Sequence, residues 1–315
     1  MENKYNLVQK IEVAVPKDRI LTDEPMAEHT TFKVGGPADI FIDIVSEDEL
    51  GKVLSILNEN NISKMNRDFY LFGNGSNLLI SDEGLRGIVL HLSKNFADID
   101  IKDEATDCRL ICKAGATLAA IARKAYDNSL TGFEFAAGIP GTLGGAIVMN
   151  AGAYDGEMKQ VVESVKLMDT QGRIFVKSCD EMDFSYRHSI IKENDFIVLE
   201  VVIRLKKGNK DDIKAKMDEL AKKRRDKQPL EYPSAGSTFK RPEGYFAAKL
   251  IQDAGLKGYS KGGAQVSEKH CGFVINKDNA SAKDIYELIK DIKLKVKQDS
   301  GVDIETEVIL LGKFD

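Results

Sequence analysis

The densest glycine segment of the chain is Gly138–Gly152, which reads G-I-P-G-T-L-G-G-A-I-V-M-N-A-G. Its glycines carry no Cβ, so a flat ligand or a pyrophosphate can lie directly against the main chain. Pro140 stiffens the approach to this stretch, and Asn150 can aim its amide at a ring carbonyl or a phosphate. The alternative reading is a glycine-rich corner between packed strands, and the glycines alone do not separate the two.

A second loop, Gly73-Asn-Gly-Ser-Asn77, follows the apolar run Phe69–Phe72. Successive small residues let backbone N–H groups converge on an anion. The loop is not a Walker loop, since no Gly-Lys-Ser/Thr follows, and it is not a dinucleotide fingerprint, since no helix pattern follows. By itself it indicates a tight turn. Together with 138–152 it favours a nucleotide-type cofactor.

The elements expected around these loops give an α+β fold without regular βαβ alternation. Strands are expected at Asp39–Ile44, Phe69–Phe72, Ile88–Leu92, Arg109–Lys113, Val161–Met168, Arg173–Lys177, Phe196–Leu205 and Val302–Leu311. Helices are expected after the capping signals Ser46-Glu-Asp-Glu49, Thr117 and Ser281-x-x-Asp284. Further helices are expected at Asp211–Arg225 and just before Gly255, and Gly132 is expected to end the helix that begins at Thr117.

Composition places the chain among soluble globular proteins. It has 315 residues, 45 basic against 50 acidic side chains, a net charge of -5, 43% hydrophobic and 30% charged residues. This length predicts two domains, and the acidic balance argues against a nucleic-acid partner. The four cysteines form no cluster, which predicts reduced thiols and no metal site. No signal-peptide pattern and no apolar run of ~20 residues is present, so we expect a cytoplasmic protein with no membrane partner.

Four further residues could carry chemistry: Arg187, Ser237, Glu307 and Lys227. On the expected final strand Glu305 and Glu307 share a face, and burial at the strand edge would affect the protonation of Glu307. Lys227 ends a basic stretch that could neutralise phosphates. Each has a plain alternative: a surface arginine, a turn serine, a solvated glutamate and a solvated helix end.

As a set, these segments resemble the UDP-N-acetylenolpyruvoylglucosamine reductase family. The resemblance covers the chain from about residue 20 to the end and keeps the family order. The matching runs are His29-Thr-Thr-Phe-Lys-Val-Gly-Gly-Pro-Ala-Asp39, Gly73-Asn-Gly-Ser-Asn-Leu-Leu79, Gly138-Ile-Pro-Gly-Thr-Leu-Gly-Gly-Ala146, Asn150-Ala-Gly-Ala-Tyr154, Tyr186-Arg-His-Ser189, Ala235-Gly-Ser-Thr-Phe-Lys-Arg-Pro242, Gln265-Val-Ser-Glu-Lys-His270 and Glu305-Thr-Glu-Val308.

The resemblance implies a fold and a reaction. The fold would be a vanillyl-alcohol-oxidase-type FAD-binding domain of two α+β lobes at 25–207, after an N-terminal segment 1–24, and an α+β substrate-binding domain at 208–315. The reaction would be the NADPH-dependent reduction of UDP-N-acetylglucosamine enolpyruvate to UDP-N-acetylmuramate in peptidoglycan precursor synthesis. The short span from Arg187 to Ser237 resembles the form of the family without the inserted substrate-covering segment.

The resemblance also implies roles for single residues. Arg187 and Glu307 would stabilise the enolate-like charge, Ser237 would deliver the proton, and Tyr186, Arg187 and Lys227 would bind the substrate. FAD would be held by Gly73, Asn74, Gly75, Ser76, Asn77, Gly138, Pro140, Gly141, Thr142, Gly144, Gly145, Asn150 and Gly152, mostly through main-chain N–H groups.

Two alternative functions remain at this point. One is another FAD-dependent oxidoreductase of the same fold, such as an oxidase, against which the Ser237 and Glu307 motifs argue. The other is a non-catalytic UDP-sugar-binding protein, which would need neither Ser237 nor FAD. We expect a monomer or a weak oligomer.

Overall fold

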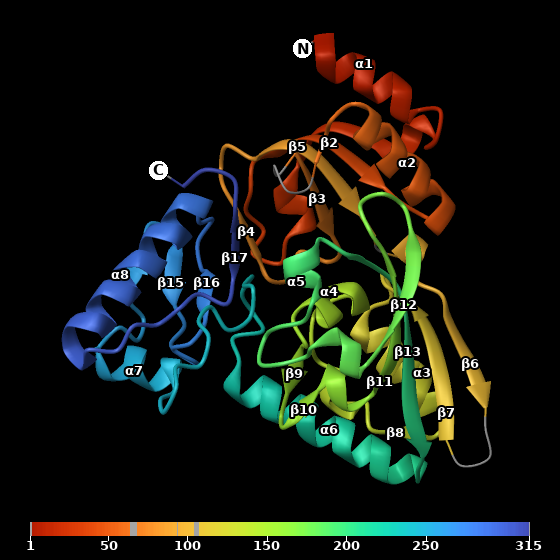
Figure 1. The fold of residues 1–315 in the computed structure, drawn as a ribbon. Coiled ribbons are helices and arrows are strands. Elements are labelled where there is room, and N and C mark those ends of the chain that lie inside the picture. Colours follow the sequence, from red (N-terminus) through yellow and green to blue (C-terminus); the bar gives the residue numbers. More distant parts are fainter. Residues whose placement is uncertain (1, 64–67, 93, 104–106, 315) are drawn as a thin grey trace. The chain divides into compact units, whose positions relative to one another are not determined.

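The computed structural model describes residues 2–63, 68–92, 94–103 and 107–314. The chain forms two compact units (Figure 1). Unit 1 consists of residues 1–22, 40–73 and 87–222, and unit 2 of residues 23–39, 74–86 and 223–315. Both units are therefore built from segments distant in sequence. The domains expected at 25–207 and 208–315 stay a prediction.

The main layer of unit 1 is a six-stranded antiparallel sheet. Its strands run in the order β12-β11-β13-β7-β6, and β8 also pairs with β13. They are β6 (Ile99–Asp103), β7 (Asp107–Lys113), β8 (Leu130–Thr131), β11 (Val162–Met168), β12 (Ile174–Ser178) and β13 (Ile197–Lys207). The short helix α4 (Leu143–Val148) packs on β13 and β7, and α3 (Leu118–Asp127) follows the Thr117 cap. Because α4 is part of the glycine-rich segment 138–152, this segment lies against the sheet at β13 and β7.

A four-stranded sheet stands in the order β1-β2-β5-β3. Its strands are β1 (Ile20–Pro25), β2 (Pro37–Asp43), β3 (Phe69–Phe72) and β5 (Leu85–His91). β3 and β5 are parallel, with Phe69 opposite Ile88. Two helices, α1 (Glu2–Ile11) and α2 (Glu47–Glu59), lie next to this sheet. The apolar side chains of α2 are buried in the core of unit 1. The first and last residues of β3 are buried. The loop at 73–77 therefore begins directly after a strand that is fixed in the core.

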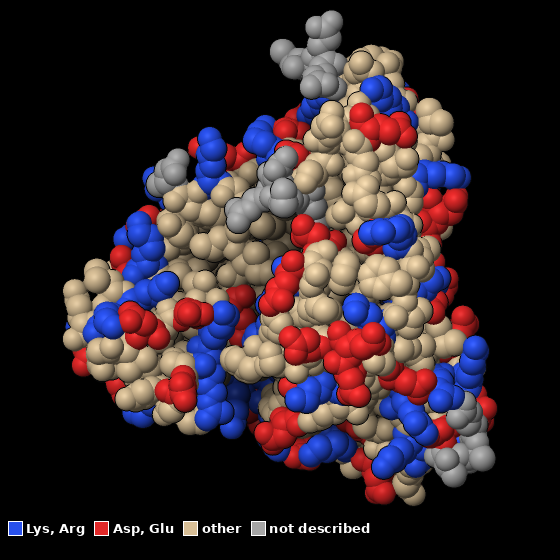
Figure 2. Space-filling view, in the orientation of Figure 1, with Lys and Arg blue, Asp and Glu red and all other residues tan. Residues whose placement is uncertain are grey.

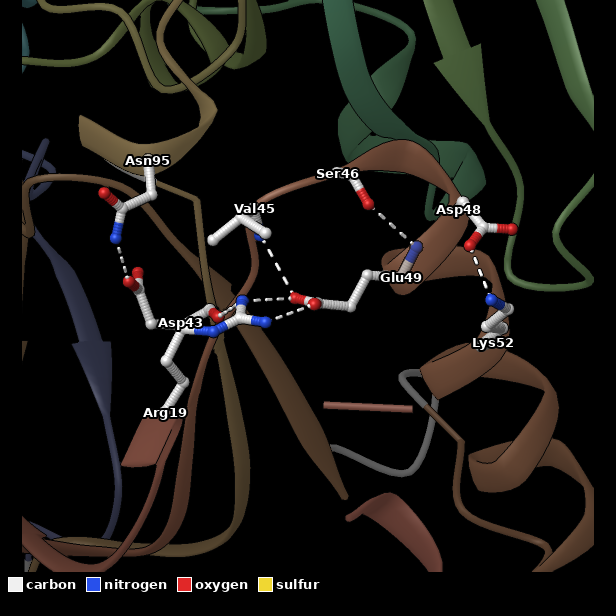
Figure 3. Close-up of polar contacts among 8 residues, drawn as sticks. All are labelled: Arg19, Asp43, Val45, Ser46, Asp48, Glu49, Lys52 and Asn95. Atoms are coloured by element: carbon white, nitrogen blue, oxygen red, sulfur yellow. Dashed lines mark hydrogen bonds and ion pairs between the residues drawn. The ribbon is translucent and has the colours of Figure 1, made fainter. Parts of the chain in front are cut away.

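One ion pair fixes the start of α2 (Figure 3). The guanidinium of Arg19 donates to both carboxylate oxygens of Glu49 at 2.7 and 2.6 Å, and to the carbonyl of Asp43 at 2.9 Å. The Glu49 carboxylate also accepts from the Val45 N–H at 3.1 Å. The side-chain hydrogen bond to Glu49 raises the pKa of Arg19, so the guanidinium stays charged. This pair ties β1 and the end of β2 to the first turn of α2.

Unit 2 contains two small sheets and two helices. A parallel pair joins β4 (Leu78–Ile80) to β17 (Ile309–Leu311). A three-stranded antiparallel sheet contains β14 (Ser260–Lys261), β15 (Ala264–Val266) and β16 (Val274–Asn276). The long helix α8 (Ala282–Ser300) packs on that sheet and on α7 (Ala247–Asp253).

Two sets of hydrogen bonds cap the N-terminus of α8. Ser281 and Asp284 form the predicted reciprocal box, with Asp284 N–H donating to Ser281 Oγ at 3.0 Å. The Asp82 carboxylate accepts from the N–H groups of Ala282 and Lys283 at 2.8 and 2.9 Å. A carboxylate at this end also meets the positive end of the helix dipole. The helix is thereby anchored to the segment that follows β4.

Several local predictions are confirmed, and three need correction. Gly132 does not end α3, because that helix stops at Asp127 with Asn128 as its cap, and Gly132 lies beyond β8. The final strand is Ile309–Leu311, not Val302–Leu311, since only these residues have a partner strand. At α2 the cap is Ser46, but the Glu49 carboxylate turns to Val45 and Arg19 and does not complete the reciprocal box.

The remaining elements are β9 (Gly152–Ala153), β10 (Gly156–Glu157), α5 (Ile191–Asn194) and α6 (Lys210–Lys227). Charged side chains cover α6, including the pair Lys216–Glu219 at 3.1 Å. On the face shown in Figure 2, acidic and basic atoms are interspersed, with no large area of one sign. Among the helices of the described residues, none combines the length and the apolar character that crossing a membrane requires.

Replacing Glu49 by Gln tests the ion pair at α2. The Arg19 guanidinium is half-buried, and the change removes the carboxylate that balances its charge. We therefore expect the free energy of unfolding to fall by about 2–3 kcal/mol. Asp48→Asn is the matched control, because Asp48 pairs with Lys52 at the exposed surface of the same helix and should matter little. Urea unfolding measures both variants, and equal losses would contradict a special role for Glu49.

Candidate functional site

In unit 1 the glycine-rich segment is pinned to the connection between β7 and α3. Leu143 and Gly144 donate their N–H groups to the carbonyls of Ala116 and Ala114, both at 2.8 Å. In return, the Gly141 carbonyl accepts from Leu118 at 3.0 Å. Residues 138–142 therefore form a loop held at its end, and α4 starts directly from it.

Four of the glycines in the two loops lie close to other atoms of the protein. A Cβ on Gly73 would lie 2.0 Å from Thr142 Oγ1, and one on Gly152 would lie 2.6 Å from the Gly156 carbonyl oxygen. Gly75 has φ +56, and a Cβ there would lie 2.1 Å from the His29 carbonyl oxygen. A Cβ on Gly144 would be 3.2 Å from that of Ala114. These positions support the alternative reading of glycines as packing residues.

Gly145 is different. It is exposed in the first turns of α4, and its nearest neighbour for a Cβ, Thr142 Oγ1, would be 3.8 Å away. Alanine is the better residue in a helix by up to ~1 kcal/mol, so neither packing nor helix formation explains a glycine here. A surface that must stay bare for a ligand does explain it.

Asn150 is buried and uses its whole amide within the protein. Its Nδ2 donates to the Glu157 carboxylate at 3.0 Å and to the Ser185 carbonyl at 3.2 Å, and its Oδ1 accepts from Lys159 N–H at 3.0 Å. Its φ of +43 lies in the left-handed region. Asn150 thus ties the end of the glycine segment to the turn that carries Arg187. A direct contact from its amide to a cofactor stays a prediction.

Arg187 lies at the corner of a tight turn. Ser185 and His188 exchange two main-chain hydrogen bonds of 3.2 Å, and Arg187 adopts φ +56. Its guanidinium stands 5.2 Å from the centre of the exposed Tyr186 ring. Left-handed backbone is uncommon for arginine and typical of sites where the surroundings hold a side chain in place. Within unit 1, the turn with Tyr186 and Arg187 and the glycine segment therefore form one assembly.

Unit 2 brings Ser237, Glu307 and Asn77 together, although they lie far apart in sequence. Phe239 and Thr306 form an antiparallel bridge, and the N–H of Glu307 donates to the Thr238 carbonyl at 2.8 Å. The amide of Asn77 donates to the Glu307 carbonyl at 3.0 Å. The strand expected at 305–307 is absent: Glu307 lies in a bend just before β17, and Glu305 is exposed and paired with Lys240.

Ser237 is exposed, and the residue that follows it is firmly held. Gly236 makes the turn with φ +75, and Ser237 is exposed. Thr238 is fully buried; its N–H donates to the Gly272 carbonyl at 2.8 Å, and its hydroxyl oxygen accepts from Val274 N–H at 3.0 Å. Ser237 is therefore accessible to a ligand, while its backbone is held by the hydrogen bonds of Thr238. A fixed position of this kind suits a side chain that must lie next to a reacting atom.

Thr31 is a residue that the motif analysis did not single out. Among the residues that the structure describes, its Oγ1 is buried without a hydrogen-bond partner. Its N–H donates to the Gly75 carbonyl at 3.4 Å, so it lies beside the loop at 73–77. A buried hydroxyl without a partner is costly and calls for an explanation, such as a ligand. The only sequence signal was its place in the run His29–Asp39.

In unit 2 the charge of Lys227 influences the titration of His270. Lys227 is the exposed last residue of α6. The pKa of His270 is lowered because burial disfavours the imidazolium, and the charge of Lys227 lowers it further. His270 Nδ1 accepts from Gly272 N–H at 3.1 Å, so the neutral ring carries its proton on Nε2.

The cysteines are poor candidates for chemistry. All four are free thiols. Burial raises the pKa of Cys108 to about 11 and that of Cys112 to about 12. Since the thiolate is the reactive form, these two residues behave as small apolar side chains of β7.

The lowered pKa of His270 predicts a pH dependence of stability. The folded protein binds this proton more weakly than the unfolded chain, whose pKa is ~6.5. The stabilisation is therefore complete above ~pH 6.5 and is lost as the pH falls below that value. We expect an NMR titration of the His270 ring to give a pKa below 6.5, and Lys227→Ala to raise it. Lys269→Ala is the control and should leave it unchanged; an equal pKa in all three proteins would contradict this account.

The chain matches models of two protein families. The model described as UDP-N-acetylenolpyruvoylglucosamine reductase, C-terminal domain, matches residues 228–311, and the FAD binding domain model matches residues 38–177. The matched ranges contain Ser237 and Glu307 on one side and both glycine loops on the other. The predicted FAD-binding domain and the α+β class are confirmed.

Named relatives cover nearly the whole chain. The UDP-N-acetylenolpyruvoylglucosamine reductase of Caldanaerobacter subterraneus subsp. tengcongensis is 50% identical over 307 residues, 98% of each chain. That of Clostridioides difficile is 51% identical over 297 residues, covering 94% of this chain and 95% of the relative. The crystal structure of the Thermus caldophilus reductase matches with a TM-score of 0.77 and 32% identity over 93% of this chain and 98% of that one. A glucose dehydrogenase, Phl p 4.0202, shares the fold alone, with a TM-score of 0.50 and 15% identity over 65% of this chain and 44% of that one. The chain belongs to the UDP-N-acetylenolpyruvoylglucosamine reductase family.

Proposed function

We propose that this chain catalyses the reaction for which its family is named, the reduction of UDP-N-acetylglucosamine enolpyruvate to UDP-N-acetylmuramate, with FAD as bound cofactor and NADPH as reductant. The observation that carries the proposal is the junction in unit 2. There the segments that carry the exposed Ser237 and Glu307 lie side by side, joined by the hydrogen bond from the Glu307 N–H to the Thr238 carbonyl. Asn77, from the loop expected to hold the cofactor, joins the same junction.

Two features of the chain fit a bound FAD. Gly145 leaves main chain exposed where packing would admit a side chain. Thr31 keeps a buried hydroxyl that has no hydrogen-bond partner among the described residues; it lies beside Gly75, where it could meet a polar group of the cofactor. The residues expected to hold FAD are those of the loops at 73–77 and 138–152. We propose that Thr31 joins them, and that the FAD-binding domain corresponds to 25–207 and the substrate domain to 208–315.

The chemistry assigns one task to each catalytic side chain. FAD supplies, when bound and reduced, the hydride that forms the new C–H bond at the methylene carbon of the enolpyruvyl group. Negative charge then develops beside the substrate carboxylate. Arg187 would stabilise it with its positive charge, and Glu307 would do so as a protonated acid that donates a hydrogen bond, because an ionised carboxylate would repel it. Ser237 gives its hydroxyl proton to the neighbouring carbon and regains one from solvent, so the double bond has gained one hydride and one proton. A serine is a weak acid, so its fixed position must compensate.

The binding groups are cationic and aromatic. Lys227 would contact the diphosphate of the substrate, and its exposure leaves the ammonium group accessible. Tyr186 and Arg187 would contact the substrate from their turn, where the ring and the guanidinium stand 5.2 Å apart. The chain would act in the cytoplasm, as a monomer or weak oligomer, with neither nucleic acid nor membrane as partner.

The direct test of the reaction is an anaerobic titration of the purified flavoprotein. NADPH should bleach the yellow absorbance, and the enolpyruvyl nucleotide should restore it with formation of UDP-N-acetylmuramate. Fast reoxidation by oxygen with no response to the nucleotide would favour an oxidase. A colourless protein that releases no flavin on denaturation would favour a UDP-sugar-binding protein.

Ser237→Ala separates the two halves of the reaction. NADPH should still reduce the flavin, because no proton from Ser237 is needed there, whereas reoxidation by the enolpyruvyl nucleotide should slow by roughly 10²–10⁴-fold. Arg187→Ala and Glu307→Gln should show the same split. Ser234→Ala, three residues earlier in the segment, serves as the control. Stopped-flow absorbance measures both steps, and normal turnover of Ser237→Ala would refute its role.

Gly145→Ala tests the bare main chain of α4. Because a Cβ has room there, the apoprotein should keep its melting temperature or gain slightly. Its dissociation constant for FAD should rise at least ~10-fold, the factor given by about 1.4 kcal/mol. Gly51→Ala is the matched control, since Gly51 also lies in a helix, with its nearest Cβ neighbour at 3.9 Å. Flavin fluorescence on reconstitution measures both, and unchanged FAD binding in Gly145→Ala would remove this position from the site.

A further inference from the structure

Asn77 holds the end of the chain through two hydrogen bonds. Its side-chain Nδ2 donates to the carbonyl of Glu307 at 3.0 Å, across 230 residues of sequence. Its own carbonyl accepts from the N–H of Ile309 at 3.0 Å. The parallel pairing of β4 with β17 begins at the next residue, with Leu78 opposite Ile309. Asn77 therefore binds the stretch 307–309 with both its side chain and its main chain.

Glu307 has no regular strand to hold it. It lies in a bend between the bridge residue Thr306 and the first residue of β17. Its N–H is bound by the Thr238 carbonyl at 2.8 Å, and its carbonyl is bound by the Asn77 amide. The amide thus replaces the ladder bond that this carbonyl would make in a strand. With both peptide groups fixed, the direction in which the Glu307 side chain leaves the backbone is fixed as well.

We propose that Asn77 is a positioning residue for Glu307. The side-chain amide holds the main chain of Glu307 in place, while the loop around Asn77 serves the cofactor. Asn77 would then link the position of the cofactor loop to the position of the carboxylate that acts on the substrate. This inference rests on the proposed function and adds to it a residue that acts through another, without touching the reacting atoms.

The link matters in only one half of the reaction. Glu307 is assigned to stabilising charge on the substrate, so its position is irrelevant to the reduction of the flavin by NADPH. A displacement of about 1 Å at a catalytic group can cost ~100-fold in rate. Loss of the Asn77 amide should therefore slow substrate reduction far more than flavin reduction. A residue that only held the flavin would affect both steps.

The experiment uses the flavin-loaded enzyme with Asn77→Ala and Asn77→Asp. The second variant keeps nearly the same volume but cannot donate a hydrogen bond, so it covers the case in which alanine perturbs the loop. Since Asn77 also belongs to the loop expected to hold FAD, both variants are first saturated with added FAD. We expect reduction of the bound flavin by NADPH to slow much less than its reoxidation. Reoxidation by the enolpyruvyl nucleotide should slow roughly 10- to 100-fold. Asn58→Ala is the control, because it also removes an amide-to-carbonyl bond between distant segments, from Asn58 to the Thr170 carbonyl at 2.7 Å.

A double-mutant cycle identifies the route of the effect. If Asn77 acts through Glu307, Asn77→Ala should slow the Glu307→Gln enzyme much less than it slows the wild type. A readout without flavin or turnover is hydrogen exchange in the apoprotein. The N–H groups of Glu307 and Ile309 should exchange faster in Asn77→Ala than in Asn58→Ala, because the stretch 307–309 loses a hydrogen bond only in the former.

Each outcome decides the matter. Equal slowing of both half-reactions, full additivity with Glu307→Gln, or normal reoxidation in both Asn77 variants would overturn the positioning role. Failure of the proposed function is a separate result: the reduced wild-type enzyme would then not be reoxidised by the enolpyruvyl nucleotide at all.

Discussion

The last strand of the chain pairs with residues that follow the first glycine loop, and the candidate site of unit 2 depends on this pairing. β17 lies parallel to β4, and the hydrogen bonds at its two ends, from Ile309 to Asn77 and from Ser81 to Leu311, fix its register. A shift by one residue would turn every side chain of the strand to the opposite side. The pairing thereby sets where residue 307 meets the segment of Ser237.

The glycines of this protein serve two purposes that look identical in a sequence. At Gly73, Gly75 and Gly152 the chain passes so close to its own atoms that no Cβ fits. At Gly145 the space is open, and the missing side chain exposes the main chain instead. The first kind shapes the loops, and the second leaves main chain open where we propose that FAD binds. Only coordinates distinguish them, because the difference lies in residues such as Thr142 and His29 that are remote in the sequence.

Predictions from the sequence succeeded where the cause is local. Ser281, Thr117 and Ser46 cap their helices because a cap needs only the next three residues. The strand expected at Val302–Leu311 was mostly wrong, because a strand exists only where a partner lies, and the partner β4 is more than 200 residues away. The roles of Ser237 and Glu307 came from the family resemblance, since each motif alone also describes an ordinary turn or edge. The bond from Asn77 to Glu307 depends on a tertiary contact that no motif in the sequence announces, and for the buried hydroxyl of Thr31 the sequence offered only its place in the run His29–Asp39.

The pairing of β17 with β4 also has a consequence for biosynthesis. Residues 73–80 leave the ribosome early, but their partner strand is translated almost last. Contacts of such sequence separation form slowly, because a long loop must close before they are gained. The junction therefore cannot assemble on the nascent chain, and it completes only once translation has ended. A polypeptide that stopped just before Ile309 would contain both glycine loops, Arg187 and Ser237, yet would lack the strand that keeps its carboxylate in register.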